Sequence, residues 1–284
     1  MNAQQEVALY PVQFGQFYNN LTLYNPAMNC TESDYQAGMG NQRLLGNFNK
    51  ISTYFLQAGM RIGSQKALNN APFSALGAML YNDREGKYLN RTRAYLNYVW
   101  HGHVSKNLSM AGGFYAGGVN YSVQGTELSG NGSDIAPDGM IGIQFYNRHF
   151  YSGISYNQIF SGQLQPLAEV SSLVPYFNVM AGYYFGISSN FEMQTDALLS
   201  LPGGLDNYKV NANLLCTWKK RVAVGLGLIN NSFLNHSIEF HDPTEELKGM
   251  TLTLSYGYPV KSMGVPARFL ELGINFNWDR MLYR

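Results

Sequence analysis

The feature that most constrains this chain is a regular alternation of apolar and polar residues over stretches of about nine or ten positions. In the segment 191–201, Phe191 and Met193 alternate with Glu192, Gln194 and Asp196. Near the C-terminus, one face carries Leu270, Leu272, Ile274, Phe276 and Trp278, and the other carries Glu271, Gly273, Asn275 and Asn277. A β-strand points successive side chains to opposite faces. Repeated segments of this length, with aromatic residues near their ends, favour a transmembrane β-barrel over a soluble sandwich.

The composition supports a barrel. Charged residues make up 13% of the chain, whereas globular domains average roughly 25%. The mean hydropathy is nevertheless −0.19, because half of each strand must be polar to line a lumen. The net charge of +1 offers no electrostatic argument for nucleic acid.

No segment reads as a transmembrane helix, which needs about 20 mostly apolar residues. The longest uncharged windows, 107–126 and 170–191, are interrupted by Gly, Asn, Ser and Pro175. Membrane insertion is therefore expected through strands, in the outer membrane. The opening Met-Asn-Ala-Gln-Gln reads like a start methionine fused to the end of a removed signal peptide. A natural cytoplasmic start is the alternative.

The alternation predicts one all-β domain, a transmembrane antiparallel barrel of about 14 strands. The predicted strands are 33–43, 49–62, 72–81, 92–104, 107–121, 138–147, 149–158, 174–185, 191–201, 208–217, 221–229, 234–241, 250–258 and 268–278. We expect a single outer-membrane domain over 1–284, with a periplasmic N-terminal arm at 1–31, the barrel at 32–278 and a C-terminal tail at 279–284.

The predicted connections alternate in length. Those at 147–149, 187–190 and 218–220 are short, whereas 122–137 and 159–173 are long. Outer-membrane barrels have short periplasmic turns and longer outer loops, so 122–137 and 159–173 are expected outside the cell. The connection 242–249 falls on the short side yet is long, which this rule does not explain.

The strand predicted at 92–104 shows how the lumen is lined. Arg93, Asn97, His101 and His103 share its polar face. We expect these groups to meet Glu192, Asp196 and Glu271 inside the barrel, because charges facing lipid cost about 2–4 kcal/mol at the midplane. A lumen of mixed sign and a folded-in arm predict a barrel closed to solutes at rest, although the pattern also suits a pore.

No catalytic motif stands out, and we expect neither an enzyme nor a cofactor. A metal could use His101 and His103, but no further ligand completes a site. Two acidic pairs in predicted outer loops, Asp83 with Glu85 and Asp134 with Asp138, could hold calcium, though solvated loop charge explains them as well. Whether Cys30 and Cys216 form a disulfide stays open, since their spacing does not indicate one.

Six stretches are similar, in order, to the PorP/SprF family of Bacteroidetes type IX secretion membrane proteins. In the arm, 17–27, an aromatic residue and Asn precede Asn25-Pro26-Ala27, and the others are 77–86, 93–98, 137–143, 150–155 and 181–185. Asn-Pro-Ala also occurs near the start of FadL-type channels. The chain departs from the family pattern at Asn41-Gln42-Arg43-Leu44 and at Leu201-Pro202, which leaves the subgroup open.

This resemblance implies a non-enzymatic outer-membrane component of type IX secretion and gliding motility. Such a component anchors or displays a secreted surface protein or the C-terminal domain of an adhesin, and couples it to a periplasmic lipoprotein or motor component. The alternatives are a FadL-like or porin-like channel for small or hydrophobic solutes and, as a third reading, a barrel enzyme such as an acyl-hydrolase.

Three groups of residues are candidates for binding partners. Tyr24, Asn25, Pro26 and Ala27 form a rigid bend, because proline fixes its own φ and extends the residue before it. This bend is a plain turn, or it docks the arm into the barrel or presents it to a periplasmic partner. Among the apolar residues of the outer loops, the candidates are Leu128, Phe160, Leu164 and Leu167. They bind protein or fold onto the barrel mouth. Lys219, Lys220 and Arg221 form a basic periplasmic turn that is either plainly solvated or contacts a lipoprotein, peptidoglycan or lipid head groups.

Overall fold

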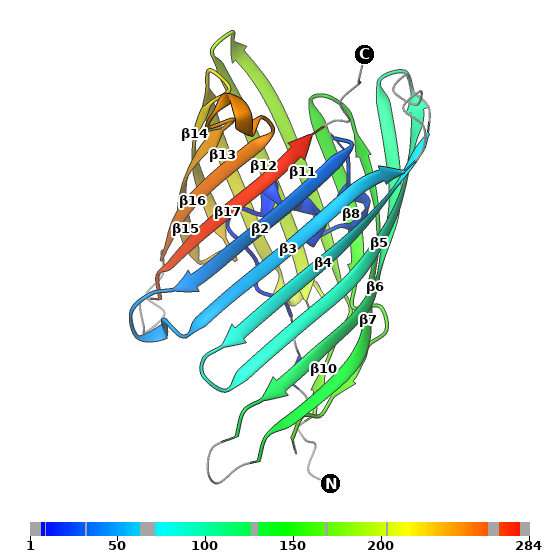
Figure 1. Ribbon diagram of the computed structural model, residues 1–284, viewed down its shortest axis with the longest axis vertical. Coiled ribbons are helices and arrows are strands. Elements are labelled where there is room, and N and C mark those ends of the chain that lie inside the picture. Colours follow the sequence, from blue (N-terminus) through cyan, green and yellow to red (C-terminus); the bar gives the residue numbers. More distant parts are fainter. Residues whose placement is uncertain are drawn as a thin grey trace.

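The structure is a computed structural model that describes residues 7–8, 10–31, 33–62, 72–125, 130–167, 170–202, 204–260 and 267–278. It contains a closed barrel of fourteen antiparallel strands (Figure 1). These strands are β2 (Tyr35–Leu44), β3 (Ile51–Ile62), β4 (Phe73–Glu85), β5 (Leu89–Ser105), β6 (Leu108–Val123), β7 (Gly132–Tyr146), β8 (Phe150–Asn157), β11 (Tyr176–Ser188), β12 (Phe191–Pro202), β13 (Lys209–Trp218), β14 (Val222–Ile229), β15 (Phe233–His241), β16 (Met250–Pro259) and β17 (Phe269–Trp278). The predicted fold class is confirmed.

Each predicted strand has one counterpart in the barrel, and two of them differ most from the predicted bounds. β4 ends at Glu85 instead of 81, and β7 begins at Gly132 instead of 138. Charged residues and Pro137 made these parts read as loop. They lie on strands because their polar side chains can face the lumen, where a strand needs no apolar residue.

The barrel closes where β17 pairs with β2, from Phe269 opposite Leu44 to Trp278 opposite Tyr35. Closure leaves no strand edge exposed to lipid. As the alternation predicts, Leu272 points outward and is exposed, whereas Glu271 points inward and is buried. Among the residues that the structure describes, no helix is long and apolar enough to cross a membrane.

The two ends of the barrel differ. At one end, which we call the short-turn end, the turns 147–149, 189–190 and 219–221 join consecutive strands. At the opposite, long-loop end, the connection between β8 and β11 contains β9 (Gln163–Leu164) and β10 (Ser171–Ser172). β10 pairs with β9 and, in parallel, with β1 (Val7–Ala8). Figure 1 shows β10 at the end of the barrel opposite to the arrowhead of β17.

The N-terminal arm is folded into the barrel, as expected for a closed lumen. It runs from β1 at the long-loop end, through the lumen, to β2, which begins at the short-turn end (Figure 1). Its 3-10 helices are η1 (Phe17–Asn19), η2 (Leu21–Leu23) and η3 (Pro26–Met28), and those of the connections are η4 (Gly46–Phe48), η6 (Leu205–Asn207) and η7 (Glu245–Leu247). The expected periplasmic arm therefore lies inside the barrel over its described residues 10–31, which we call the plug.

Candidate functional site, a plug in the barrel lumen

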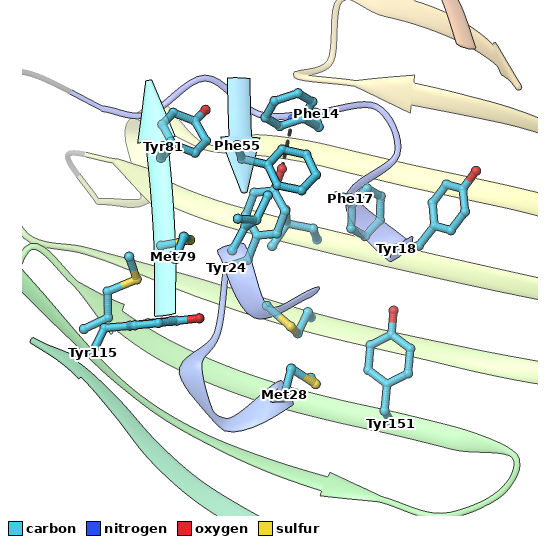
Figure 2. Packing of buried hydrophobic residues seen from close by; sticks show 14 of the residues in the cluster. Phe14, Phe17, Tyr18, Tyr24, Met28, Phe55, Met79, Tyr81, Tyr115 and Tyr151 are labelled. Atoms are coloured by element: carbon cyan, nitrogen blue, oxygen red, sulfur yellow. Dashed lines mark hydrogen bonds between the residues drawn. The ribbon is translucent and has the colours of Figure 1, made fainter. Parts of the chain in front are cut away.

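An aromatic core holds the plug in the barrel. Phe14, Phe17, Tyr24 and Met28 of the plug are buried against inward-facing side chains of the wall. Figure 2 shows Phe14 beside Phe55 of β3, and their ring centroids are 5.0 Å apart. Within the plug, the backbone N–H of Phe14 donates a 2.9 Å hydrogen bond to the Tyr24 hydroxyl. Burying aromatic rings of this size is a large apolar contribution.

The Asn25-Pro26-Ala27 bend docks the plug, which is one of the alternatives that the sequence allowed. Asn25 is extended, with φ −149° and ψ 116°, and its side chain accepts a hydrogen bond from the N–H of Ala27. This caps η3, with Pro26 at the first position, where no N–H is needed. The Asn25 amide donates to the Ile143 carbonyl at 3.0 Å, and Asn97 donates to the Pro26 carbonyl at 3.2 Å. The bend is buried inside the barrel.

Glycines of the wall make room for this bend. A Cβ added at Gly142 of β7 would overlap the Asn25 side chain, and one added at Gly59 of β3 would overlap Asn29. At Gly113 of β6, the added atom would lie 2.9 Å from the Pro26 carbonyl oxygen. Glycine permits such close approach because it has no side chain. The wall is therefore shaped to the plug.

Two buried carboxylates bind the other half of the plug. Glu271 of β17 accepts hydrogen bonds from the backbone N–H groups of Gly15, at 2.7 Å, and Gln16, at 3.1 Å. Glu239 of β15 accepts from the Tyr18 hydroxyl at 2.8 Å and from the Asn19 amide at 2.6 Å. Hydrogen bonds to an ionised carboxylate are stronger than those between neutral groups.

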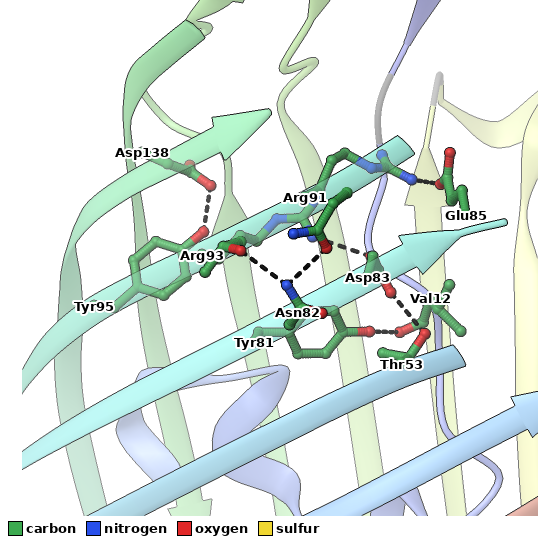
Figure 3. Close-up of polar contacts among 12 residues, drawn as sticks. Val12, Thr53, Tyr81, Asn82, Asp83, Glu85, Arg91, Arg93, Tyr95 and Asp138 are labelled. Carbon is green, nitrogen blue, oxygen red and sulfur yellow. Dashed lines mark hydrogen bonds and ion pairs between the residues drawn. The ribbon is translucent and has the colours of Figure 1, made fainter. Parts of the chain in front are cut away.

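Arg93 finds different partners from those expected. Its guanidinium lies 3.2 Å from the carboxylate of Asp83 on the neighbouring strand β4. Figure 3 shows this pair. Asp196 and Glu271 lie on β12 and β17, which do not neighbour β5. Glu192 is largely exposed and lies 3.4 Å from Lys220. Pairing with these three acids was a wrong prediction, because strand neighbours are decided by the closed topology.

The two acidic pairs are not built as calcium sites. Asp83 and Asp138 are each 1% exposed, so placing them in outer loops was wrong. In Figure 3, Asp138 accepts from the Tyr95 hydroxyl and Glu85 forms an ion pair with Arg91. Among the described residues, no group of three or more His, Cys, Asp and Glu side chains is placed to hold a metal ion.

His101 and His103 lie in different surroundings and do not form a common site. His101 is buried and hydrogen-bonds to the Tyr146 hydroxyl at 2.9 Å and the Asn29 carbonyl at 2.8 Å, so it contacts the plug. His103 is exposed and lies beside Ser109 at the short-turn end. Both thiols, Cys30 in the plug and Cys216 on β13, are free, so the disulfide left open by the sequence is not formed.

The outer-loop candidates divide between packing and exposure. Leu164 is 0% exposed and packs with Val119, Tyr121, Ala136 and Leu173 at the barrel mouth. Phe160 and Leu167 are 53% and 40% exposed. Leu128 lies outside the described residues. Leu164 therefore folds onto the barrel mouth, whereas protein binding by Phe160 and Leu167 stays a prediction.

The basic turn lies on the rim of the short-turn end. Lys219, Lys220 and Arg221 are exposed, and the first two have positive φ, 49° and 56°, as a tight hairpin turn requires. The Lys219 ammonium lies 5.0 Å from the centroid of the Trp218 ring. The three candidate groups are not brought together, since they occupy the lumen, the long-loop end and the short-turn end.

The plug borders two cavities. One, of about 700 Å³, lies at the short-turn end and is lined by Tyr18, Thr22 and Met28 of the plug and by Arg148 of the turn. The other, of about 30 Å³, is lined by Tyr24 of the plug. The sequence predicted a folded-in arm, but not that wall glycines and carboxylates would bind it. The signal in the sequence was the frequent occurrence of glycine at inward-facing strand positions, where the wall makes room for the plug.

Solved structures of low identity share the fold. The CymD monoaromatic hydrocarbon channel aligns with a TM-score of 0.55 and 11% identity over 92% of this chain and 93% of its own. The Ralstonia pickettii toluene transporter TbuX gives 0.53 and 10% over 92% and 94%. A Pseudomonas aeruginosa FadL homologue gives 0.51 and 9% over 89% and 93%. No curated protein matches the chain.

A family model describes nearly the whole chain. The model for the type IX secretion system membrane protein PorP/SprF matches residues 6–275. Together with the barrel, it points to the outer membrane and to interaction with secretion machinery and cargo in general. The chain therefore belongs to the PorP/SprF family of type IX secretion system membrane proteins.

Proposed function

We propose that this protein is a closed, non-enzymatic outer-membrane component of the type IX secretion and gliding machinery. It anchors or helps display secreted surface proteins, or an adhesin C-terminal domain, and couples them to a periplasmic lipoprotein or motor component. The short-turn end faces the periplasm, as in other outer-membrane barrels. Removal of a signal peptide before assembly is part of the same proposal.

The observation that carries this proposal is the plug. Its backbone is bound from several walls, by Glu271 on β17, Asn97 on β5 and Ser155 on β8, the last donating to the Tyr24 carbonyl at 2.6 Å. Each such hydrogen bond contributes about 0.5–1.5 kcal/mol net, so several together favour a filled lumen. A filled lumen suits a barrel that works through its outer surfaces.

The long-loop end supplies a surface for a secreted partner. Leu164 anchors the connection between β8 and β11, while Phe160 and Leu167 stay exposed beside it. Exposed apolar side chains on an anchored loop are typical of a protein-binding surface. At the other end, Lys219, Lys220 and Arg221 present positive charge to the periplasm.

A solute channel is the second candidate. The shared fold with a hydrocarbon channel and a toluene transporter favours it, and so does the cavity of about 700 Å³ beside the plug. In that function, the plug would have to move before a solute could pass.

The test replaces Phe160 with Asp and Leu167 with Asp in the native host. Because both side chains are exposed, the barrel should still insert, which heat-modifiable migration on a gel reports. Loss of the surface-displayed partner, with unchanged uptake of toluene, is the expected result. The control is Asn107→Asp, in an exposed turn. Ile141 is also exposed, but its side chain faces lipid, so Ile141→Asp does not serve as a control. Unchanged display together with reduced toluene uptake would reject the anchor and support the channel.

A further inference from the structure

The larger cavity, which we call the vestibule, opens at the short-turn end between the plug and the barrel wall. Its volume of about 700 Å³ lies in the range of ligand-binding sites. Among the described residues that line it, Arg148 and His241 are the only basic ones, and none is a carboxylate. Most of the others carry an amide, a hydroxyl or an aromatic ring. His241 lies 3.5 Å from the buried Glu239, outside the lining, so the positive charge that meets a ligand is that of Arg148. A polar ligand that is neutral or that places a negative charge near Arg148 therefore suits this lining.

Two amides of the vestibule are buried and incompletely bonded. Gln144 of β7 is 0% exposed and donates to the Thr31 hydroxyl at 2.8 Å, but its Oε1 atom has no partner in the protein. Asn275 of β17 is also buried, and its Nδ2 atom has none. A buried polar atom without a partner costs about 1–3 kcal/mol. Both residues line the vestibule, so a ligand bound there lies beside these two amides.

The same wall already recognises a polypeptide. Asn97 donates to the Pro26 carbonyl at 3.2 Å, and Asn178 of β11 donates to the Tyr24 carbonyl at 3.2 Å. Gln36 of β2, which lines the vestibule, accepts from the Cys30 N–H at 2.9 Å. Side-chain amides thus bind backbone groups of a polypeptide along the lumen. The amides of Gln144 and Asn275 belong to the same polar wall where it borders the vestibule.

We propose that the vestibule binds an extended, acidic polypeptide segment of a periplasmic protein, through its backbone and through a carboxylate placed near Arg148. Arg148 is exposed at the mouth, on the turn between β7 and β8, where it can pair with a carboxylate without leaving water completely. The inference rests on the proposed coupling to periplasmic machinery and gives that coupling a site.

The probe is a random heptapeptide library displayed on phage, selected on the purified, detergent-solubilised full-length protein. Peptides that survive selection are synthesised with a fluorescent label, and their Kd is measured by fluorescence anisotropy. We expect the selected peptides to be enriched in Asp and Glu. Chitotetraose, a neutral glycan with similar hydrogen-bonding groups, is measured in parallel because aromatic and amide linings also suit sugars.

Two substitutions locate the binding. Arg148→Glu reverses the charge at the mouth and should weaken the selected peptides at least tenfold. Asn275→Leu removes the buried amide and should also weaken them. Lys106→Glu, on another turn of the same rim but outside the vestibule, is the matched control and should leave the Kd unchanged. Because Arg148 and Lys106 are both exposed, neither reversal should prevent folding.

Failure to select any peptide, or equal affinity for the wild type and the Arg148→Glu protein, would overturn the inference. Binding of chitotetraose that depends on Arg148 and Asn275, without peptide binding, would replace it with a glycan site. These outcomes are independent of the Phe160 and Leu167 test. If the Phe160 and Leu167 substitutions abolish surface display but no peptide binds, only the vestibule proposal is rejected. If peptides bind but those substitutions leave display normal, only the anchoring proposal is rejected.

Discussion

The side-chain amide of Asn25 lies 3.0 Å from the carbonyl oxygen of Ile143, across 118 positions of sequence. The same side chain accepts the Ala27 N–H at 2.9 Å. One residue therefore sets the local bend of the plug and fixes that bend to the barrel wall. Loss of this residue should affect closure of the lumen more than formation of the barrel, which rests on strand pairing.

Replacing Asn25 with Ala should loosen the plug. The change removes a helix cap and a wall contact, which together contribute about 1–3 kcal/mol. We expect intermittent conductance in planar bilayers, where the wild type should be closed. Asn107→Ala, in an exposed turn, is the control and should stay closed. If neither variant conducts, Asn25 is not needed for closure of the lumen.

Adding a side chain at Gly142 should exclude the bend from its seat. A Cβ there overlaps Asn25, whereas one at Gly112 of β6 meets nothing within 4 Å. We expect Gly142→Val to insert as a barrel and conduct, and Gly112→Val to behave like the wild type. Limited proteolysis would show the displaced arm as a new cleavage site. A plug protected equally in both variants would contradict the close fit seen here.

The Cys30 thiol should report on the position of the plug. It is 0% exposed, between the plug and the wall, so maleimide labelling should be slow in the folded protein. Cys216 is first replaced with Ser so that Cys30 is the single thiol. Adding Asn25→Ala should then speed labelling at least tenfold. Rapid labelling of Cys30 before any other change would mean that the plug leaves the lumen readily.

Breaking the Arg93–Asp83 pair should destabilise the barrel strongly. Both side chains are buried, and an unpaired buried charge costs about 3–5 kcal/mol. We expect Asp83→Leu to lower the urea midpoint of unfolding in detergent, and Asp83→Leu with Arg93→Leu to recover part of the loss. Glu192→Gln removes an exposed partner of Lys220 and should change stability by no more than about 1 kcal/mol. Equal urea midpoints for Asp83→Leu, the double variant and Glu192→Gln would contradict this expected order of stability.

The fold could be predicted from the sequence because alternation is a local property. Leu272 and Glu271 reveal the two faces of β17 without knowledge of any other strand. Strand ends were less predictable where polar residues continue inside the lumen, as at Asp83 and Asp138. In a barrel, a polar residue is compatible both with a loop and with an inward-facing strand position.

The sequence alone determined that Asn25-Pro26-Ala27 is a rigid bend, since proline restricts its own φ and the residue before it. It also determined that Arg93 faces the lumen. Only the tertiary structure decided that the bend sits against Gly142 and that Arg93 pairs with Asp83 instead of Glu271. The physical reason is that the direction in which a side chain points follows from local backbone geometry. The residues that it contacts follow from the order in which fourteen strands close around the arm.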